Sequence, residues 1–324
     1  MRLARALGAF AAALVLATAV GFALIWYVRP GMDQYAAHHY TAAPSPGALT
    51  ATWFGVTAVL LSDGAHAVFV DPFFTRPTGF WRMASNRPIA PDPALIEGWL
   101  ARAGVTELDA VLVSHSHFDH AMDAGVVARL AGARLAGSAS TLNVGRGAGL
   151  AESQLVAMPS GETRRFGSFE VTFIESRHAG ATGGAPTGDI LVPLAPPARY
   201  LDYRQGGTYS ILIEHPQGRA LHHGSAGFAR GALAGRRADV VFLGIALVPG
   251  LPEYLEQVVE AVGARRVVPV HWDDFTRPLG ATLRPFPLVV RLDRFFEGMA
   301  RRPGLAVQTL EPGRRVALFP AAAP

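Results

Sequence analysis

The chain has 324 residues, of which half are hydrophobic and 17% are charged, and its formal net charge is +4. This length fits an N-terminal segment followed by one large two-sheet domain or two small ones. The absence of cysteine excludes disulfides, thiolate metal ligands and a lipid-modified N-terminal cysteine. Every basic residue is arginine, and no arginine run with interleaved aromatic residues indicates a nucleic-acid surface, so no nucleic-acid partner is expected.

The first 29 residues predict a membrane anchor or a signal segment. Arg2 and Arg5 precede an uncharged apolar run from Ala6 to Val28, which as a helix is about 35 Å long and can span a bilayer. Positive charge before the run predicts that the following domain lies outside the cytoplasm, in the periplasm or the extracellular space. A cleavable signal peptide is the alternative, with secretion as its consequence, because residues 17–19 read Ala-Thr-Ala. The apolar run continues past that point, which favours an uncleaved anchor.

A linker over residues 30–50 leads into a predicted β-hairpin. Strands are expected over residues 51–54 and 56–61, with a turn at Ser62-Asp63-Gly64 and a returning strand over 67–70 that ends at Asp71. Residues 73–93 form an irregular segment whose aromatic residues are either packed on themselves or one wall of a substrate cleft. A helix is expected over 93–104, because a proline stands near its start and a glycine at its end.

The next predicted strand runs directly into a cluster of metal-ligand residues. The apolar residues 111–113 are followed by His115, His117, Asp119 and His120. Imidazole and carboxylate are both ligands of zinc. On an extended backbone His115 and His117 point to one side, about 6–7 Å apart, which suits two ligands of one ion. Asp119 and His120 lie where the chain turns and can face a second ion.

This His-x-His-x-Asp-His pattern after an apolar strand resembles the signature of the metallo-β-lactamase superfamily. The resemblance implies an α/β (α+β) fold, a four-layer αββα sandwich over residues 51–319, with 320–324 as a tail. It also implies a supporting role for Asp71 beside the site. The motif is specific for the fold and the metal site but not for the substrate, because this fold hosts many hydrolases.

Two further strand ends occupy the places where this superfamily carries its remaining ligands. His178 follows a predicted strand over 168–174, and His271 follows one over 266–270. The Pro-Val-His-Trp sequence at 269–272 is similar to the branch of ascorbate-phosphate lactonases and N-acylphosphatidylethanolamine-hydrolysing phospholipase D. The resemblance therefore assigns His115, His117 and His178 to one metal, and Asp119, His120 and His271 to a second.

One position departs from the superfamily pattern. Where dinuclear members carry a bridging aspartate, this chain has Ser225. A hydroxyl is a poorer bridging ligand than a carboxylate, so the second metal should bind more weakly, or a water must bridge the ions alone. Asp273 or Asp274 could compensate from nearby, and His223 could also approach the site.

The ligand set favours Zn²⁺, as one or two ions, and allows Mn²⁺ or Fe²⁺. Such an ion lowers the pKa of its bound water and supplies hydroxide at neutral pH. Asp119 would orient this hydroxide and protonate the leaving group. The predicted function is a metal-dependent hydrolase acting on an ester, lactone or phosphodiester.

The substrate is expected to be a small molecule, with the anchor favouring a lipid-like one. Tyr200, Tyr203 and Arg204, in the long loop 179–207, are candidate substrate contacts, with surface packing as the alternative. A weakly active or inactive metal-binding envelope protein and a nuclease of the same superfamily are the alternative functions. Nothing in the sequence indicates the oligomeric state.

Overall fold

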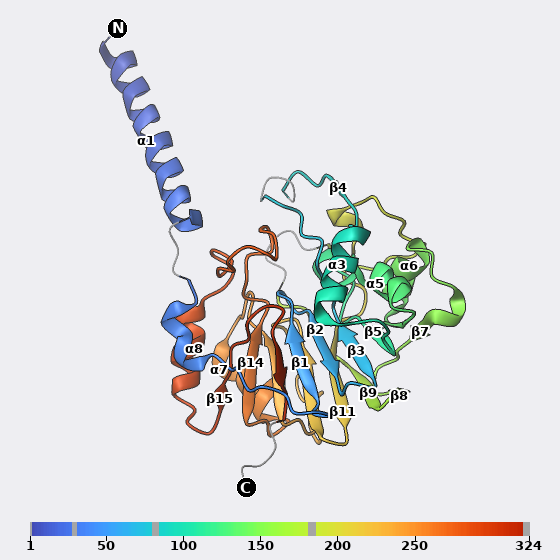
Figure 1. Ribbon diagram of the computed structural model, residues 1–324. Coiled ribbons are helices and arrows are strands. Elements are labelled where there is room, and N and C mark those ends of the chain that lie inside the picture. Colours follow the sequence, from blue (N-terminus) through green and yellow to red (C-terminus); the bar gives the residue numbers. More distant parts are fainter. Residues whose placement is uncertain (1, 28–30, 80–83, 181–185, 320–324) are drawn as a thin grey trace.

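Two seven-stranded β-sheets pack face to face in the computed structural model, with helices on their outer faces (Figure 1). The structure describes residues 2–27, 31–79, 84–180 and 186–319. The first sheet has the order β16-β1-β2-β3-β5-β6-β7, formed by Arg315–Ala317, Thr50–Trp53, Val59–Ser62, Ala67–Val70, Ala110–Leu112, Arg134–Gly137 and Leu155–Ala157. The second has the order β15-β14-β13-β12-β11-β9-β8, formed by Ala306–Val307, Arg266–Val270, Val240–Gly244, Gly218–His223, Tyr209–His215, Phe169–Glu175 and Thr163–Phe166. A short third sheet pairs β10 (Ala198–Arg199) with β4 (Pro88–Ile89).

The helices cover the outer faces of the two large sheets and complete the four layers. In Figure 1, α3 (Pro93–Ala103), α5 (Ala124–Leu130) and α6 (Ala139–Gly147) lie on one side, and α7 (Leu251–Leu255) and α8 (Leu292–Ala300) on the other. The ends of α3 follow its sequence, because the Asp92 side chain accepts a hydrogen bond from the Leu95 N–H and Gly104 ends the helix in a left-handed conformation. The predicted αββα fold is confirmed.

Strand direction brings the candidate ligands to one edge of the sandwich. β3 runs parallel to β5 in the first sheet, and β12 runs parallel to β13 and β14 in the second. β9 has the same direction as β12, because both are antiparallel to β11. The segments that follow β5, β9 and β14 carry the histidines singled out in the sequence, and α4 (Phe118–Ala121) holds the second half of the motif.

Several element boundaries differ from the sequence predictions. Strand β2 begins at Val59, and not at residue 56, because Val56 lies in a tight turn with a φ of 46°. Apolar residues at helical spacing predict one helix over residues 252–262, but α7 ends at Leu255 and continues as a π-helical turn over Glu256–Glu260. A helix is also expected over residues 288–299, but α8 begins at Leu292, because Leu288 has a left-handed φ of 63° that no helix accommodates. Within the irregular segment 73–93, residues 80–83 lie outside the described residues.

The N-terminal helix α1 (Arg2–Tyr27) projects away from the domain (Figure 1). Its stretch Arg5–Ile25 is long and apolar enough to cross a membrane, by length and composition, and none of it is buried against the protein. This is consistent with an anchor or a signal segment. The chain then forms a short helix, η1 (Asp33–His38), where the Tyr35 ring stacks on Phe296 of α8 with centroids 4.0 Å apart.

Candidate metal centre

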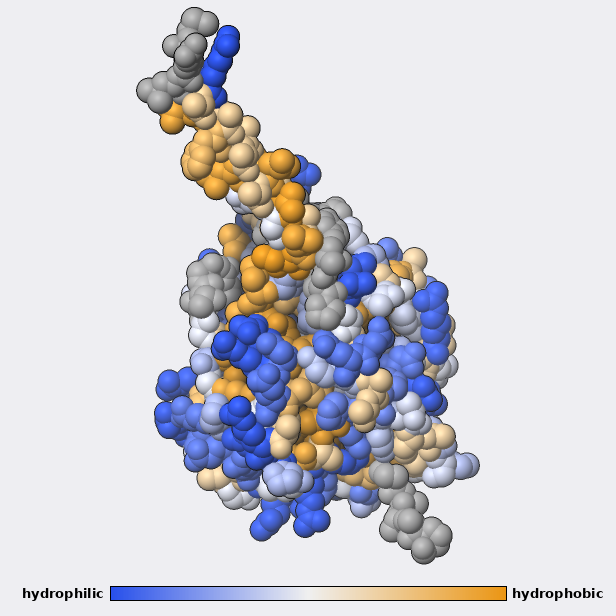
Figure 2. Space-filling model, turned by 90° about the vertical axis from the view of Figure 1, so that its left-hand side faces the viewer, coloured by the Kyte–Doolittle hydropathy of each residue, from blue (hydrophilic) through white to orange (hydrophobic). Residues whose placement is uncertain are grey.

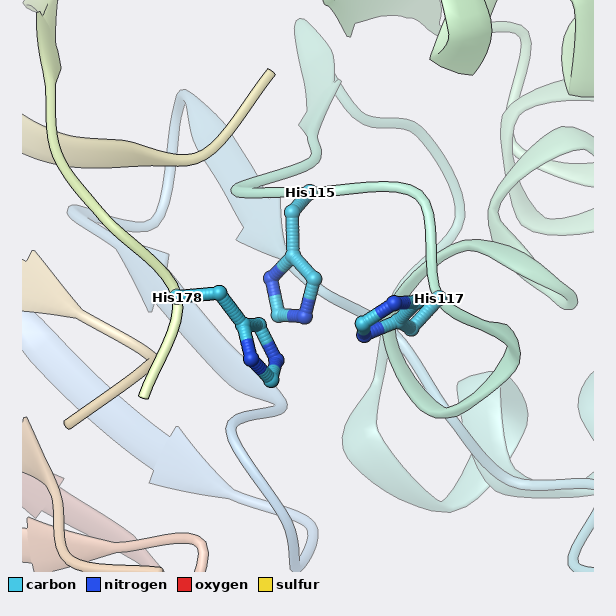
Figure 3. Close-up of side chains that lie close together, drawn as sticks. All are labelled: His115, His117 and His178. Carbon is cyan, nitrogen blue, oxygen red and sulfur yellow. The ribbon is translucent and has the colours of Figure 1, made fainter. Parts of the chain in front are cut away.

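Three histidines form the first cluster of potential metal ligands. His115 and His117 come from the segment after β5, and His178 from the segment after β9, with their rings converging on one point (Figure 3). The ring centroids are 4.7 to 4.9 Å apart in all three pairs. Each residue offers a ligand atom within 4.8 Å of the other two, which is a spacing that one ion can bridge.

Asp119, His120 and His271 form a second cluster beside the first. The Oδ2 atom of Asp119 lies 3.6 Å from His120 Nε2 and 3.3 Å from His271 Nε2. The ring of His120 is 3.8 Å from that of His115, so the two clusters adjoin. His271 has a left-handed φ of 58°, a strained conformation held by a 2.6 Å hydrogen bond from its N–H to the Val56 carbonyl.

Four of the five histidines in the clusters are held through one ring nitrogen, which leaves the other nitrogen for a metal. His117 donates through Nε2 to the Pro186 carbonyl, and His178 donates through Nδ1 to the Ala179 carbonyl. His120 donates through Nδ1 to Asp71 at 2.9 Å. His115 lies 3.2 Å from the Ser114 hydroxyl through Nδ1, and its buried Nε2 has no partner. Metal-ligating histidines in proteins are held in this way by their second nitrogen.

The electrostatics keep the first cluster neutral and Asp119 ionised. Burial and the neighbouring imidazoles hold the pKa of His115 well below its usual range, and burial lowers the pKa of His117 to about 4. Burial alone would raise the pKa of Asp119, but His120 and His271 outweigh it and lower that pKa. Neutral imidazole and ionised carboxylate are the forms that bind metals.

Asp71 supports the second cluster from behind. It is fully buried after β3, with a left-handed φ of 47°. Its carboxylate accepts hydrogen bonds from the Ser114 backbone and hydroxyl, from the Thr57 hydroxyl and from His120. Thr57 and Ser114 were not singled out in the sequence, because their role depends on a carboxylate brought from another strand.

The residues that could have compensated for Ser225 are engaged elsewhere. Ser225 is buried and its hydroxyl accepts a 2.8 Å hydrogen bond from the Ala179 N–H, next to His178. Asp273 forms a buried ion pair with Arg76 at 2.8 Å. Asp274 accepts hydrogen bonds from the backbone and the hydroxyl of Thr276. None of these groups belongs to either ligand cluster within the described residues.

His223 is also committed, in this case to the protein interior. Its Nδ1 accepts from the Ser210 hydroxyl at 2.7 Å, and its Nε2 donates to the Gly227 carbonyl at 2.8 Å. The expectation that His223 could approach the metals is therefore wrong, because both ring nitrogens have partners.

The three candidate substrate contacts have different surroundings. Tyr203 is only 1% exposed and packs in the hydrophobic core, which favours a packing role for it over substrate contact. Arg204 is exposed. Tyr200 lies edge-on to Phe118 with centroids 5.0 Å apart, and burial together with the Asp119 charge raises its pKa to about 12. Tyr200 thus lies close enough to the candidate metal centre for the charge of Asp119 to affect its pKa.

A sandwich of this type, with histidine and aspartate clusters at one edge, defines a metal-dependent hydrolase of the metallo-β-lactamase fold. Residues 66–272 match the model of the β-lactamase superfamily domain, and the chain belongs to this family. It is 28% identical over 257 residues to a UPF0173 metal-dependent hydrolase of Myxococcus xanthus, a match covering 76% of this chain and 78% of the relative. A UPF0173 metal-dependent hydrolase of Pyrobaculum islandicum is 25% identical over 232 residues, covering 69% of this chain and 84% of the relative.

Solved structures show the same fold at low identity. Igni18, a metallo hydrolase from Ignicoccus hospitalis, matches with a TM-score of 0.52 at 17% identity, covering 83% of this chain and 97% of its own. An isothiocyanate hydrolase from Delia radicum gut bacteria matches with a TM-score of 0.53 at 14% identity, covering 84% of this chain and all of its own. These structures share the fold of this chain, and its class as a metal-dependent hydrolase rests on the family match and the UPF0173 relatives.

Proposed function

We propose that the protein is a membrane-anchored hydrolase of esters, lactones or phosphodiesters, with Zn²⁺ as its metal. The observation that carries this proposal is the pair of adjoining ligand clusters, which offer five histidines and one carboxylate at one edge of the sandwich. His115, His117 and His178 are the proposed ligands of the first ion. Asp119, His120 and His271 are the proposed ligands of the second.

The described side chains suit the remaining tasks of hydrolysis. When bound, the metal supplies a Lewis acid that activates water and polarises the substrate oxygen. The lowered pKa of Asp119 keeps it ionised, so it can orient the attacking water and accept its proton. The raised pKa of Tyr200 keeps its hydroxyl protonated, so it can donate a hydrogen bond to the substrate.

The buried serine at position 225 favours unequal metal sites. It supplies no carboxylate, and its hydroxyl is turned to the Ala179 N–H. We propose that the first ion binds more tightly than the second. The same observation supports the alternative of a weakly active metal-binding protein, which the retention of six ligand residues opposes.

The N-terminal helix supports an extracytoplasmic location for the domain. Basic residues precede its apolar stretch, and the helix makes no buried contact with the domain. An enzyme held in this way meets substrates at the membrane surface, which favours lipid-like ones.

The test is metal content combined with hydrolysis, on the full chain in detergent. Elemental analysis is paired with turnover of bis-p-nitrophenyl phosphate and of a simple γ-lactone, for the native chain and for His117→Ala. His66→Ala is the matched control, because the His66 side chain is half-exposed and lies outside both clusters. We expect metal and turnover to be lost in His117→Ala only. A native chain that takes up no Zn²⁺, Mn²⁺ or Fe²⁺ and turns over neither substrate would overturn the proposal.

A further inference from the structure

A cavity lies between α7 and α8, and no residue of the two ligand clusters lines it. It has a volume of about 1080 Å³. Its walls are mainly apolar and include Ile245, Val248, Leu251, Val289 and Phe295. Cavities of this size bury a molecule as large as a drug or a lipid chain.

Two leucines stand exposed at this cavity in unusual backbone conformations. Leu247 is 39% exposed with a φ of 57°, and Leu288 is 79% exposed with a φ of 63°. The Leu247 N–H donates to the Val289 carbonyl at 3.0 Å, which fastens the two segments together. The left-handed region is costly for a leucine, so two such residues beside one opening indicate an interaction surface.

Four arginines and one acidic residue, Glu297, line the cavity, so the charge of its lining is net positive. Arg294 lies on α8 and Arg301 directly follows its last residue, and neither has a carboxylate within 4.0 Å among the described residues. By contrast, Arg291 pairs with Asp293, and Arg302 pairs with Glu260. Guanidinium groups bind carboxylates and phosphates through two parallel hydrogen bonds.

The cavity lies on the face of the domain that is next to the N-terminal helix. Helix α8, which forms one wall, packs through Phe296 against η1, the first described element after α1. Figure 2 shows this face, where apolar surface continues from the foot of α1 onto the domain between hydrophilic borders. Gly180 also lines the cavity, so the cavity reaches the segment that carries His178.

We propose that this cavity binds the acyl chain of an anionic lipid taken from the membrane surface, with its head group at Arg294 and Arg301. The apolar interior suits an acyl chain, the two guanidinium groups without ion-pair partners suit an anionic head group, and the place beside the anchor gives access to the membrane surface. The inference deepens the proposed function and rests on it only for the consequence that the bound lipid is hydrolysed. The binding itself is independent of hydrolysis.

Photocrosslinking of the full chain in phosphatidylcholine nanodiscs tests the binding. The probe is phosphatidylglycerol with a diazirine near the end of one acyl chain, and phosphatidylcholine with the same chain is the zwitterionic comparison, which has no net charge. Crosslinked peptides are mapped by mass spectrometry. Crosslinks to α1 serve as the internal standard, because that helix meets lipid irrespective of the cavity. The double variant Arg294→Ala/Arg301→Ala is compared with Arg129→Ala/Arg237→Ala, which removes two exposed arginines elsewhere.

We expect the anionic probe to label residues 245–252 and 288–298 more strongly than the zwitterionic probe. Relative to α1, this labelling should fall about tenfold in the Arg294/Arg301 variant and stay unchanged in the control. Labelling confined to α1 and the linker, or equal for both probes, would overturn the inference. If the probe labels these segments but the protein hydrolyses no ester or phosphodiester, the lipid site is supported and only the proposed function is contradicted.

Discussion

Replacement of Asp71 by asparagine should weaken metal binding although Asp71 is not itself a proposed ligand. The carboxylate accepts from three side chains and one backbone N–H, and its Oδ2 fixes the His120 ring through Nδ1. An asparagine presents an NH₂ group in place of one oxygen. If that group faces His120, the imidazole must carry its proton on Nε2, the nitrogen that points to Asp119.

The expected loss is about 10- to 100-fold in metal affinity, or roughly 1.4 to 2.7 kcal/mol, as for other residues that orient metal-bound histidines. A competition titration measures it, with Zn²⁺ added to metal-free full-length protein in the presence of a fluorescent chelator. Asp123→Asn is the matched control, because Asp123 is equally buried, accepts from the Phe74 and Thr75 N–H groups and contacts no proposed ligand. An Asp71→Asn protein that binds Zn²⁺ as tightly as the native chain would refute the reasoning.

Three other predictions concern catalysis, packing and pH. Asp119→Asn should lower kcat by about 10²- to 10⁴-fold, since the proton acceptor is lost; full activity at native metal content, measured by turnover with elemental analysis, would contradict its role. Ser225→Ala should cost about 1 to 3 kcal/mol of unfolding free energy, because the buried Ala179 N–H loses its acceptor, and denaturant unfolding against Ser160→Ala measures this. Burial raises the pKa of Asp123 to about 6, so the contribution of its protonated carboxyl to the unfolding free energy is fully present below about pH 4 and is lost as pH rises through 6. Asparagine does not titrate, so between pH 4 and pH 7 the native chain should lose up to about 3 kcal/mol of unfolding free energy that Asp123→Asn does not lose. Denaturant unfolding of both proteins across this pH range measures the difference, and a difference that does not change with pH would contradict the prediction.

The clustering of the candidate metal ligands could be predicted from the sequence because the fold places them at strand ends. His115, His178 and His271 each follow an apolar strand that periodicity identifies, and parallel directions bring such ends to one edge. The boundary errors have local causes. Val56 and Leu288 adopt left-handed conformations. Valine and leucine rarely do so, and therefore their residue types do not predict it.

Other features depend on tertiary contacts that no sequence pattern records. The buried pair of Arg76 and Asp273 joins distant parts of the chain, so Asp273 looked available for the metals. Tyr203 and Tyr200 are indistinguishable in the sequence, although one is buried in the core and the other lies near Asp119. The acceptor for His117 is the backbone carbonyl of Pro186, which carries no side-chain signal at all.

The charge of the two ligand clusters affects the last step of turnover, the release of the product. Asp119 is their single carboxylate, and the histidines bring no negative charge. Bound dications would therefore keep an excess of positive charge at the centre. The proposed ester, lactone and phosphodiester substrates all yield an anionic product on hydrolysis, and a positively charged centre would slow its release. Product departure, and not bond cleavage, is then expected to limit turnover, and inorganic phosphate should act as a competitive inhibitor.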